Sequence, residues 1–177
     1  MAVPPYITFR ALEMDDFSSF IEIQHDAILN APEVFGSDYD WFDALSVLSK
    51  EQRYQEYMDF PYQYLLGALN EREEILGMIG FSCEKSRKKL RHKGRIWGMY
   101  VIPEERGQGI ATALVESVLE TASEIDCEHV TLTVGTKNRE SYGLYLRMGF
   151  SVYGTEVHAM KIEDEYVDEY LMVKFLK

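Results

Sequence analysis

The chain has 177 residues, 46% hydrophobic and 27% charged, a composition typical of one folded domain and unlike that of a disordered chain. Its 18 Lys and Arg against 30 Asp and Glu give a net charge of −12, which would repel nucleic-acid phosphates and anionic membranes, so we expect neither as a partner. Cys83 and Cys127 are too few for a disulfide framework and lack zinc-ligand spacing, so we expect no metal and a reducing, cytoplasmic location.

The first third of the chain is predicted to form a strand followed by helices. Residues 7–12 have the alternation of a strand, and Asp15 and Asp16 can cap a helix that ends near Asn30. A proline and a glycine then interrupt the pattern. Apolar residues return at helical intervals over residues 38–59, which predicts a second helical region.

The middle of the chain is predicted to contain a hairpin, a further strand and a long amphipathic helix. Residues 62–69 and 75–83 are β-type runs joined by a polar turn. A basic loop, residues 85–95, carries seven Lys and Arg and no acidic residue, and it leads into a strand over residues 95–102. Apolar residues at three- and four-residue steps predict a helix over residues 109–125.

The last part of the chain is predicted to add a strand, a short helix and two more strands. Residues 130–134 alternate as in a strand, Asn138 can cap a helix that runs through Met148, and Gly149 fits the position after its end. The two final strands are expected over residues 150–161 and 166–176. This mixed order of strands and helices indicates an α+β fold rather than a strict βαβ repeat.

A glycine-containing turn joins the strand over residues 95–102 to the long helix. Gly107 and Gly109 lack a Cβ, so a ligand can approach the main chain, and the free N–H groups of the first helical turn favour a pyrophosphate. Arg106 adds positive charge. An ordinary strand-to-helix connection fits the same residues. A P-loop is excluded because no Gly-Lys-Ser/Thr follows, and Thr112 at the third glycine position argues against a Rossmann turn.

Two motifs in the second half of the chain carry a family resemblance. In the first, Tyr100-Val101-Ile102-Pro103 ends a strand, and Arg106-x-x-Gly109-x-Ala111 begins a helix. In the second, Asn138 is followed by Tyr142, Tyr145 and the pair Gly149-Phe150. Together they resemble the acyl-CoA-binding strand, the pyrophosphate loop and the helix exit of the GNAT superfamily of N-acetyltransferases.

The resemblance implies a single GNAT-like domain over residues 1–177, with a central mixed, mostly antiparallel sheet flanked by helices. Such a domain transfers the acetyl group of acetyl-CoA directly to an amine without a metal. Main-chain N–H groups near Tyr100 and Val101 would polarise the thioester carbonyl, and Tyr145 would protonate the departing thiolate. The residues implied to bind the cofactor are Tyr100, Val101, Arg106, Gly107, Gln108, Gly109, Ile110, Ala111 and Asn138.

The general base stays open, because the strand over residues 95–101 carries no carboxylate. Candidates are Glu33, Asp38, Glu156 and His158, and a water relay would serve equally. Gly98 within this strand predicts a bulge or a close backbone approach, or is simply a tolerated glycine.

The acceptor and the partners are less constrained by the sequence. The acceptor is a small molecule or a protein amino group, and the net negative charge favours a cationic amine. A non-catalytic acyl-CoA-binding module would keep the same glycine turn. Nucleic-acid binding through the basic loop, residues 85–95, is a third reading. Edge pairing by the two final strands would allow a homodimer.

Overall fold

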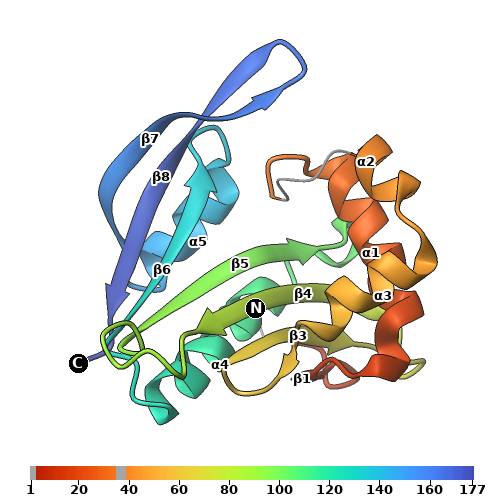
Figure 1. Cartoon of the computed structure of the whole chain (residues 1–177), viewed down its shortest axis with the longest axis horizontal. Helices are drawn as coiled ribbons and strands as arrows, with labels where there is room; N and C mark the ends of the chain where they lie inside the picture. The colour runs from red at the N-terminus through yellow and green to blue at the C-terminus, as the bar shows by residue number, and fades with distance from the viewer. Residues whose placement is uncertain (1–2, 35–38) are drawn as a thin grey trace.

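The computed structural model describes residues 3–34 and 39–177, and its strands form one sheet (Figure 1). The strands are β1 (Thr8–Ala11), β2 (Met58–Asp59), β3 (Gln63–Leu69), β4 (Ile75–Cys83), β5 (Lys93–Val101), β6 (His129–Gly135), β7 (Ser151–Ile162) and β8 (Glu165–Phe175). The helices are α1 (Phe17–Asn30), α2 (Tyr39–Ala44), α3 (Val47–Gln55), α4 (Ile110–Glu124) and α5 (Arg139–Arg147), with short 3-10 turns η1 (Met14–Asp16) and η2 (Pro103–Glu105).

The sheet has the strand order β1-β3-β4-β5-β6-β8-β7, with β2 beside β3. All these pairs are antiparallel except β5 with β6. The predicted α+β fold with a mixed, mostly antiparallel sheet is therefore confirmed. Strand β7 forms one edge of the sheet, and a homodimer through this edge stays a prediction.

Two apolar cores cover opposite faces of the sheet because side chains alternate along the strands. On β3, Tyr64 and Leu66 belong to the core that includes the buried face of α4. The intervening Leu65 belongs to the second core, with Phe20 of α1 and Tyr54 of α3. The apolar face predicted for the long helix is the buried face of α4, so this prediction is confirmed.

The sheet opens between β5 and β6. Their parallel pairing covers only the positions from Lys93↔His129 to Arg95↔Thr131, whereas β6 stays paired with β8 along its whole length. Figure 1 shows the two strands diverging beyond this point. On its other side β5 stays paired with β4 as far as Val101, and the register shifts opposite Gly98, which has φ +59°. The predicted bulge is therefore present.

Three expected boundaries need correction. The helical region over residues 38–59 is two helices and the short strand β2, because Ser46 starts α3 afresh by accepting a hydrogen bond from Ser49 N–H (3.1 Å). The side chain of Asp16 does not cap α1 and binds Arg10 instead. Strand β5 begins at Lys93, so the last residues of the basic loop belong to a strand.

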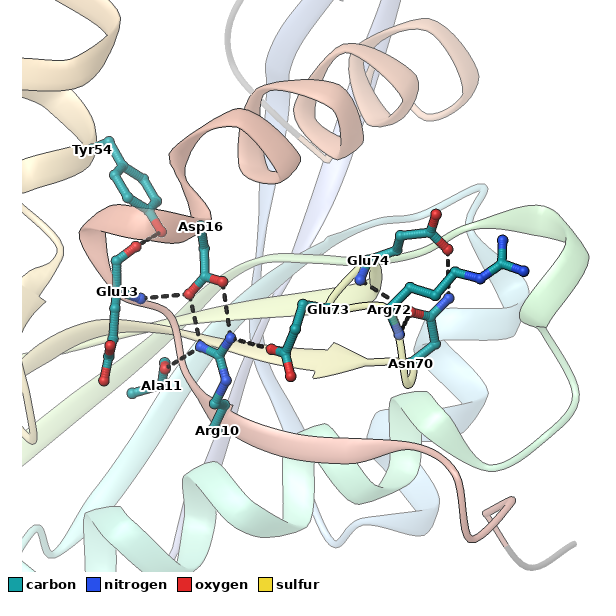
Figure 2. Close-up of polar contacts among 9 residues, drawn as sticks. All are labelled: Arg10, Ala11, Glu13, Asp16, Tyr54, Asn70, Arg72, Glu73 and Glu74. Carbon is teal, nitrogen blue, oxygen red and sulfur yellow. Dashed lines mark hydrogen bonds and ion pairs between the residues drawn. The ribbon is translucent and has the colours of Figure 1, made fainter.

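A partly buried ion pair joins β1 to the start of α1 (Figure 2). Arg10 donates to both carboxylate oxygens of Asp16, at 2.7 and 2.9 Å, and also to Glu73 in the β3–β4 turn at 2.6 Å. Asp16 further accepts the backbone N–H of Glu13 (2.7 Å), and Glu13 O accepts the hydroxyl of Tyr54 (2.7 Å). This network holds β1, the start of α1 and the end of α3 together.

Asp16→Asn should lower the free energy of unfolding by about 1–3 kcal/mol, because a charged hydrogen-bond acceptor in a buried position is lost. For a chain of this length, that is a fall in Tm of roughly 2–12 °C. Asp15→Asn is the matched control, since Asp15 is exposed. Thermal unfolding at pH 7 measures both changes, and equal stability of the two variants would contradict the assignment.

The effect of Asp16→Asn should also depend on pH. The hydrogen bond from Arg10 lowers the pKa of Asp16 from its ordinary 3.8, so the stabilisation is complete above that value. It is lost as the pH falls through the lowered pKa of the folded state. The difference in the free energy of unfolding between wild type and variant should therefore be constant near neutral pH and shrink in acid. Thermal unfolding at a series of pH values measures this difference.

Candidate active site

Two cavities meet where β5 and β6 diverge. The loop cavity, of about 910 Å³, is lined by the end of β5, the turn before α4, and α5. The aromatic cavity, of about 490 Å³, is lined by α1, α3, β5 and β6 and contains the side chains of Trp41, Tyr54, Tyr57 and Trp97. Residues that line both cavities mark the junction: Glu33, Val34, Met99, Asn138 and Ser141.

The turn before α4 exposes main-chain donors to the loop cavity. Gly107 and Gly109 have φ of +77° and +83°, a conformation that costs glycine little, and a Cβ at Gly107 would meet open space. The first intrahelical bond runs from Ala113 N–H to Gly109 O (3.0 Å), so the N–H groups of the preceding helical residues have no helical acceptor. Such an array at a helix N-terminus fits an anion, including a pyrophosphate.

Arg106 is held beside this turn by β5. Its Nε donates to Val101 O (3.0 Å), and its guanidinium carbon lies 5.5 Å from the centroid of the Tyr100 ring. The hydroxyl of Tyr100 in turn donates to Asp26 Oδ2 of α1 (2.6 Å). Burial, with the nearby Asp26 carboxylate, raises the pKa of Tyr100 to about 12, so this donor keeps its proton at neutral pH. The ring of Tyr100 therefore lies beside Arg106, and its hydroxyl ties it to α1.

The backbone of Val101 faces the opening in the sheet. Ile102 N–H donates to Leu76 O of β4 (3.0 Å), and Val101 is the neighbouring residue, opposite Gly77. In an antiparallel pair, alternate residues direct their N–H and C=O groups toward and away from the partner strand. Val101 therefore directs its polar groups away from β4, toward the side from which β6 has departed, whereas Tyr100 directs its own toward β4.

Helix α5 brings Asn138 and Tyr145 to the junction and the aromatic cavity. Asn138 caps the helix as predicted, because its Oδ1 accepts Ser141 N–H (3.1 Å). Tyr145 is buried, packs edge-on against Phe150 with ring centroids 5.8 Å apart, and lines the aromatic cavity. Burial raises the pKa of Tyr145, so the phenol is protonated at neutral pH.

The structure brings together most of the residues that the sequence singled out. The loop cavity is lined by Tyr100, Val101, Arg106, Gly107, Gly109, Ile110, Ala111 and Asn138. Gln108 is not among its lining residues, because its side-chain amide turns to Glu105 (2.7 Å).

The four candidate bases are placed very differently. Glu33 lines both cavities, and its side chain lies near Gly135 of β6. Glu156 and His158 are on β7 and line neither cavity; the His158 ring stacks on Tyr166 at 4.1 Å. Asp38 lies outside the described residues.

Apart from Glu33, the charged residues of the aromatic cavity were not predicted from the sequence as site residues. Lys50 and Arg53 come from α3, Arg95 from β5, and Glu169 from β8. Glu169 pairs with Gly135 on one side and faces Glu156 on the other. Burial and the Glu156 carboxylate raise its pKa. Only the three-residue spacing of Lys50 and Arg53 was visible in the sequence, since it places both on one face of a helix.

Comparison with known proteins agrees with the fold. Residues 27–150 match the model of the acetyltransferase (GNAT) family, and the chain belongs to this family. Mycothiol acetyltransferase of Propionibacterium freudenreichii is 26% identical over 153 residues, which cover 81% of this chain and 42% of that protein. An uncharacterized N-acetyltransferase of Mycobacterium tuberculosis is 31% identical over 102 residues, 49% of this chain and 64% of that protein. The chain thus spans less than two thirds of these relatives.

Solved structures show the same fold over nearly the whole chain. An acetyltransferase of the GNAT family from Streptococcus pneumoniae superposes with a TM-score of 0.82 at 22% identity, covering 97% of this chain and 99% of that one. A protein of Salmonella typhimurium whose structure includes its cofactor acetyl-CoA superposes with a TM-score of 0.80 at 17% identity, covering 97% and 95%. In the described part of this chain, no helix is both long and apolar enough to cross a bilayer.

Proposed function

We propose that this chain transfers an acetyl group from acetyl-CoA to a primary amine, with the cofactor in the loop cavity and the acceptor in the aromatic cavity. The observation that carries the proposal is the junction, where the two cavities share Glu33, Met99 and Asn138. Two substrates bound on either side would meet there. A non-catalytic acyl-CoA-binding module needs only the loop cavity, and the second cavity favours the enzyme.

The loop cavity fits acetyl-CoA, which supplies the acetyl thioester when it is bound. The main-chain N–H groups at the start of α4 would hold the pyrophosphate, with Arg106 beside them. Arg139 and Arg147 of α5 also line this cavity and add positive charge. Val101 N–H, which points away from β4, would donate to the thioester carbonyl as negative charge develops there.

Two side chains are proposed to move the protons. Glu33 at the junction would accept a proton from the acceptor's ammonium, because only the uncharged amine is nucleophilic. Tyr145 keeps its proton at neutral pH and would give it to the leaving thiolate. Both groups line the cavity assigned to the acceptor, Glu33 from the segment after α1 and Tyr145 from α5.

Acetyl-CoA should stabilise the protein, and Gly109→Glu should abolish this effect by placing a side chain and a negative charge at the phosphate position. At about 100 times its Kd, a ligand adds about 2.7 kcal/mol, or roughly 5–11 °C in Tm for a chain of this length. Ser123→Glu is the control, since Ser123 is exposed near the other end of α4. Melting curves with and without acetyl-CoA test this; no shift in the wild type would defeat the assignment.

Tyr145→Phe should bind acetyl-CoA normally and transfer the acetyl group at least ~10²-fold more slowly, because only the acidic hydroxyl is removed. Single-turnover transfer measures the chemical step. Tyr142→Phe is the control on the same helix, because Tyr142 packs on Tyr170 and lines neither cavity. Equal rates in Tyr145→Phe and the wild type would return Tyr145 to a packing role.

Glu33→Gln should lower the transfer rate by ~10²–10⁴-fold near neutral pH, since the acceptor must then lose its proton to water. The defect should shrink as the pH rises, because more of the acceptor arrives uncharged. Glu22→Gln is the control, as Glu22 is an exposed residue of α1. If Glu169→Gln, and not Glu33→Gln, produced the pH-dependent loss, Glu169 would be the base and the assignment of Glu33 would be wrong.

A further inference from the structure

The charge of the aromatic cavity differs from that of the chain. The whole chain has 30 acidic and 18 basic residues. The aromatic cavity instead has more basic than acidic side chains in its lining: Lys50, Arg53, Arg95, Glu33 and Glu169. The local charge at a binding site decides which ligand groups are held there, because distant exposed charges are screened by salt.

Two of the three basic side chains of the cavity, Lys50 and Arg53, lie on aromatic rings. Neither forms an ion pair with a carboxylate of the described residues. Lys50 Nζ lies 4.7 Å from the centroid of Phe42, and the guanidinium carbon of Arg53 lies 4.7 Å from that of Trp41. A guanidinium that lies over a ring keeps the N–H donors in its own plane available for a planar anion.

Arg95 differs from these two cations because Glu169 is close to it. Burial and the Glu156 carboxylate raise the pKa of Glu169, and the positive charge of Arg95 acts in the opposite direction. The positive charge of Arg95 is therefore partly balanced inside the cavity. The unbalanced positive charge lies on α3.

Glu33 and the two cations of α3 occupy different parts of the cavity. Glu33 lies at the junction with the loop cavity, where the amine must be placed. Lys50 and Arg53 line the aromatic cavity alone, away from the junction. A ligand with an ammonium group and an anionic group finds a partner of opposite charge for each.

The wall between these groups is apolar and aromatic. Tyr57 of the segment after α3 and Trp97 of β5 lie with ring centroids 4.8 Å apart, and Trp41 completes the wall. Such rings bury the apolar body of a ligand.

We propose that the acceptor carries an anionic group, in the first place a carboxylate, beside its primary amine, and that Lys50 and Arg53 bind this group. Amino acids and their phosphonate analogues are the chemical class. The proposal rests on the proposed function, since it places the acceptor in the aromatic cavity. It also refines the expectation of a cationic amine: the ammonium group is kept, and the net charge of the acceptor is near zero.

Matched pairs of acceptors test the proposal. L-Phenylalanine and L-leucine are compared with phenethylamine and isopentylamine, which lack only the carboxylate, and the phosphonate analogue of phenylalanine tests whether another anion is accepted. The acid-bearing member of each pair should have a kcat/KM roughly 10- to 100-fold higher, as expected for a charged hydrogen bond. Equal or better use of the decarboxylated amines would overturn the proposal.

Substitutions in α3 then locate the anion site. In Arg53→Gln and Lys50→Gln, the ratio of kcat/KM between the two members of a pair should fall by roughly 10- to 100-fold, mainly through KM of the acid. Arg53→Lys should retain part of the ratio. Lys93→Gln is the control, because Lys93 is an exposed residue of β5 that lines neither cavity. A ratio that is unchanged in both α3 variants would overturn the assignment.

Ligand binding can be measured without turnover. Trp41 and Trp97 are the two tryptophans of the chain, and both line the aromatic cavity. Titrating L-phenylalanine and phenethylamine into the protein saturated with CoA should change the tryptophan fluorescence, with tighter binding of L-phenylalanine that Arg53→Gln weakens. Tighter binding of phenethylamine would overturn the proposal.

Failure of the proposed function is distinguishable from failure of this proposal. If acetyl-CoA does not shift Tm, the loop cavity is wrongly assigned and the proposed function fails. If acetyl-CoA binds but only amines without an anionic group are acetylated, or no member of any pair is, the acceptor class is wrong.

Discussion

The early end of the parallel pairing between β5 and β6 is the constraint on which the site depends. The pairing stops at Arg95 and Thr131, while β4 continues to satisfy one edge of β5 and β8 continues to satisfy one edge of β6. Each half of the sheet therefore remains hydrogen-bonded on its outer side. The inner edges alone are released, and this leaves the main-chain N–H of Val101 able to bind a ligand, since its carbonyl accepts from Arg106.

The contacts around β5 show how this opening is maintained. The bulge at Gly98 changes the register between β4 and β5 just before Tyr100, whose hydroxyl is bound to Asp26 of α1. Trp97, three residues before Tyr100, lies so close to Gly80 of β4 that a Cβ at position 80 would clash with its ring. A larger residue at position 80 would push the indole into the aromatic cavity. Strand β5, which lines both cavities, is therefore held in place by contacts with β4 and with α1.

The partly buried ion pair of Arg10 and Asp16 supports the same site from the other side. Through Glu13 and Tyr54 it connects the start of α1 to α3 (Figure 2). Tyr54 is a wall residue of the aromatic cavity, and α3 carries Lys50 and Arg53. Packing alone would leave the rotation of a nine-residue helix weakly determined. A hydrogen bond from one of its buried side chains to a fixed carbonyl determines it more closely, and with it the direction in which the two cations point.

The features that were predicted from the sequence are determined by residues that lie close together in the chain. The long helix follows from the spacing of Leu114, Val115 and Val118, and the turn before it from glycines that adopt positive φ. Asn138 was recognised because a capping side chain bonds within its own first turn. Glu169 could not be recognised, since it reaches the cavity only through the pairing of β8 with β6. The division between α2 and α3 was missed because both segments have similar apolar spacing.

The net charge of the chain is determined by its composition, whereas the charge that lines the aromatic cavity is determined by the fold. The net charge of −12 is a property of the sequence, and it acts on a ligand that approaches from solution. Its reach is limited, because charges farther apart than ~8 Å are largely screened at physiological salt. At the aromatic cavity, Arg53 and Lys50 act on a bound ligand over a few ångströms, a range over which salt screens charges little. A ligand with only an ammonium group is drawn to the molecule but has no partner on α3, and one with only an anionic group is repelled before it arrives. A zwitterion, whose net charge is near zero, is not repelled by the net charge of the chain and has a partner of opposite charge for each of its groups inside the cavity.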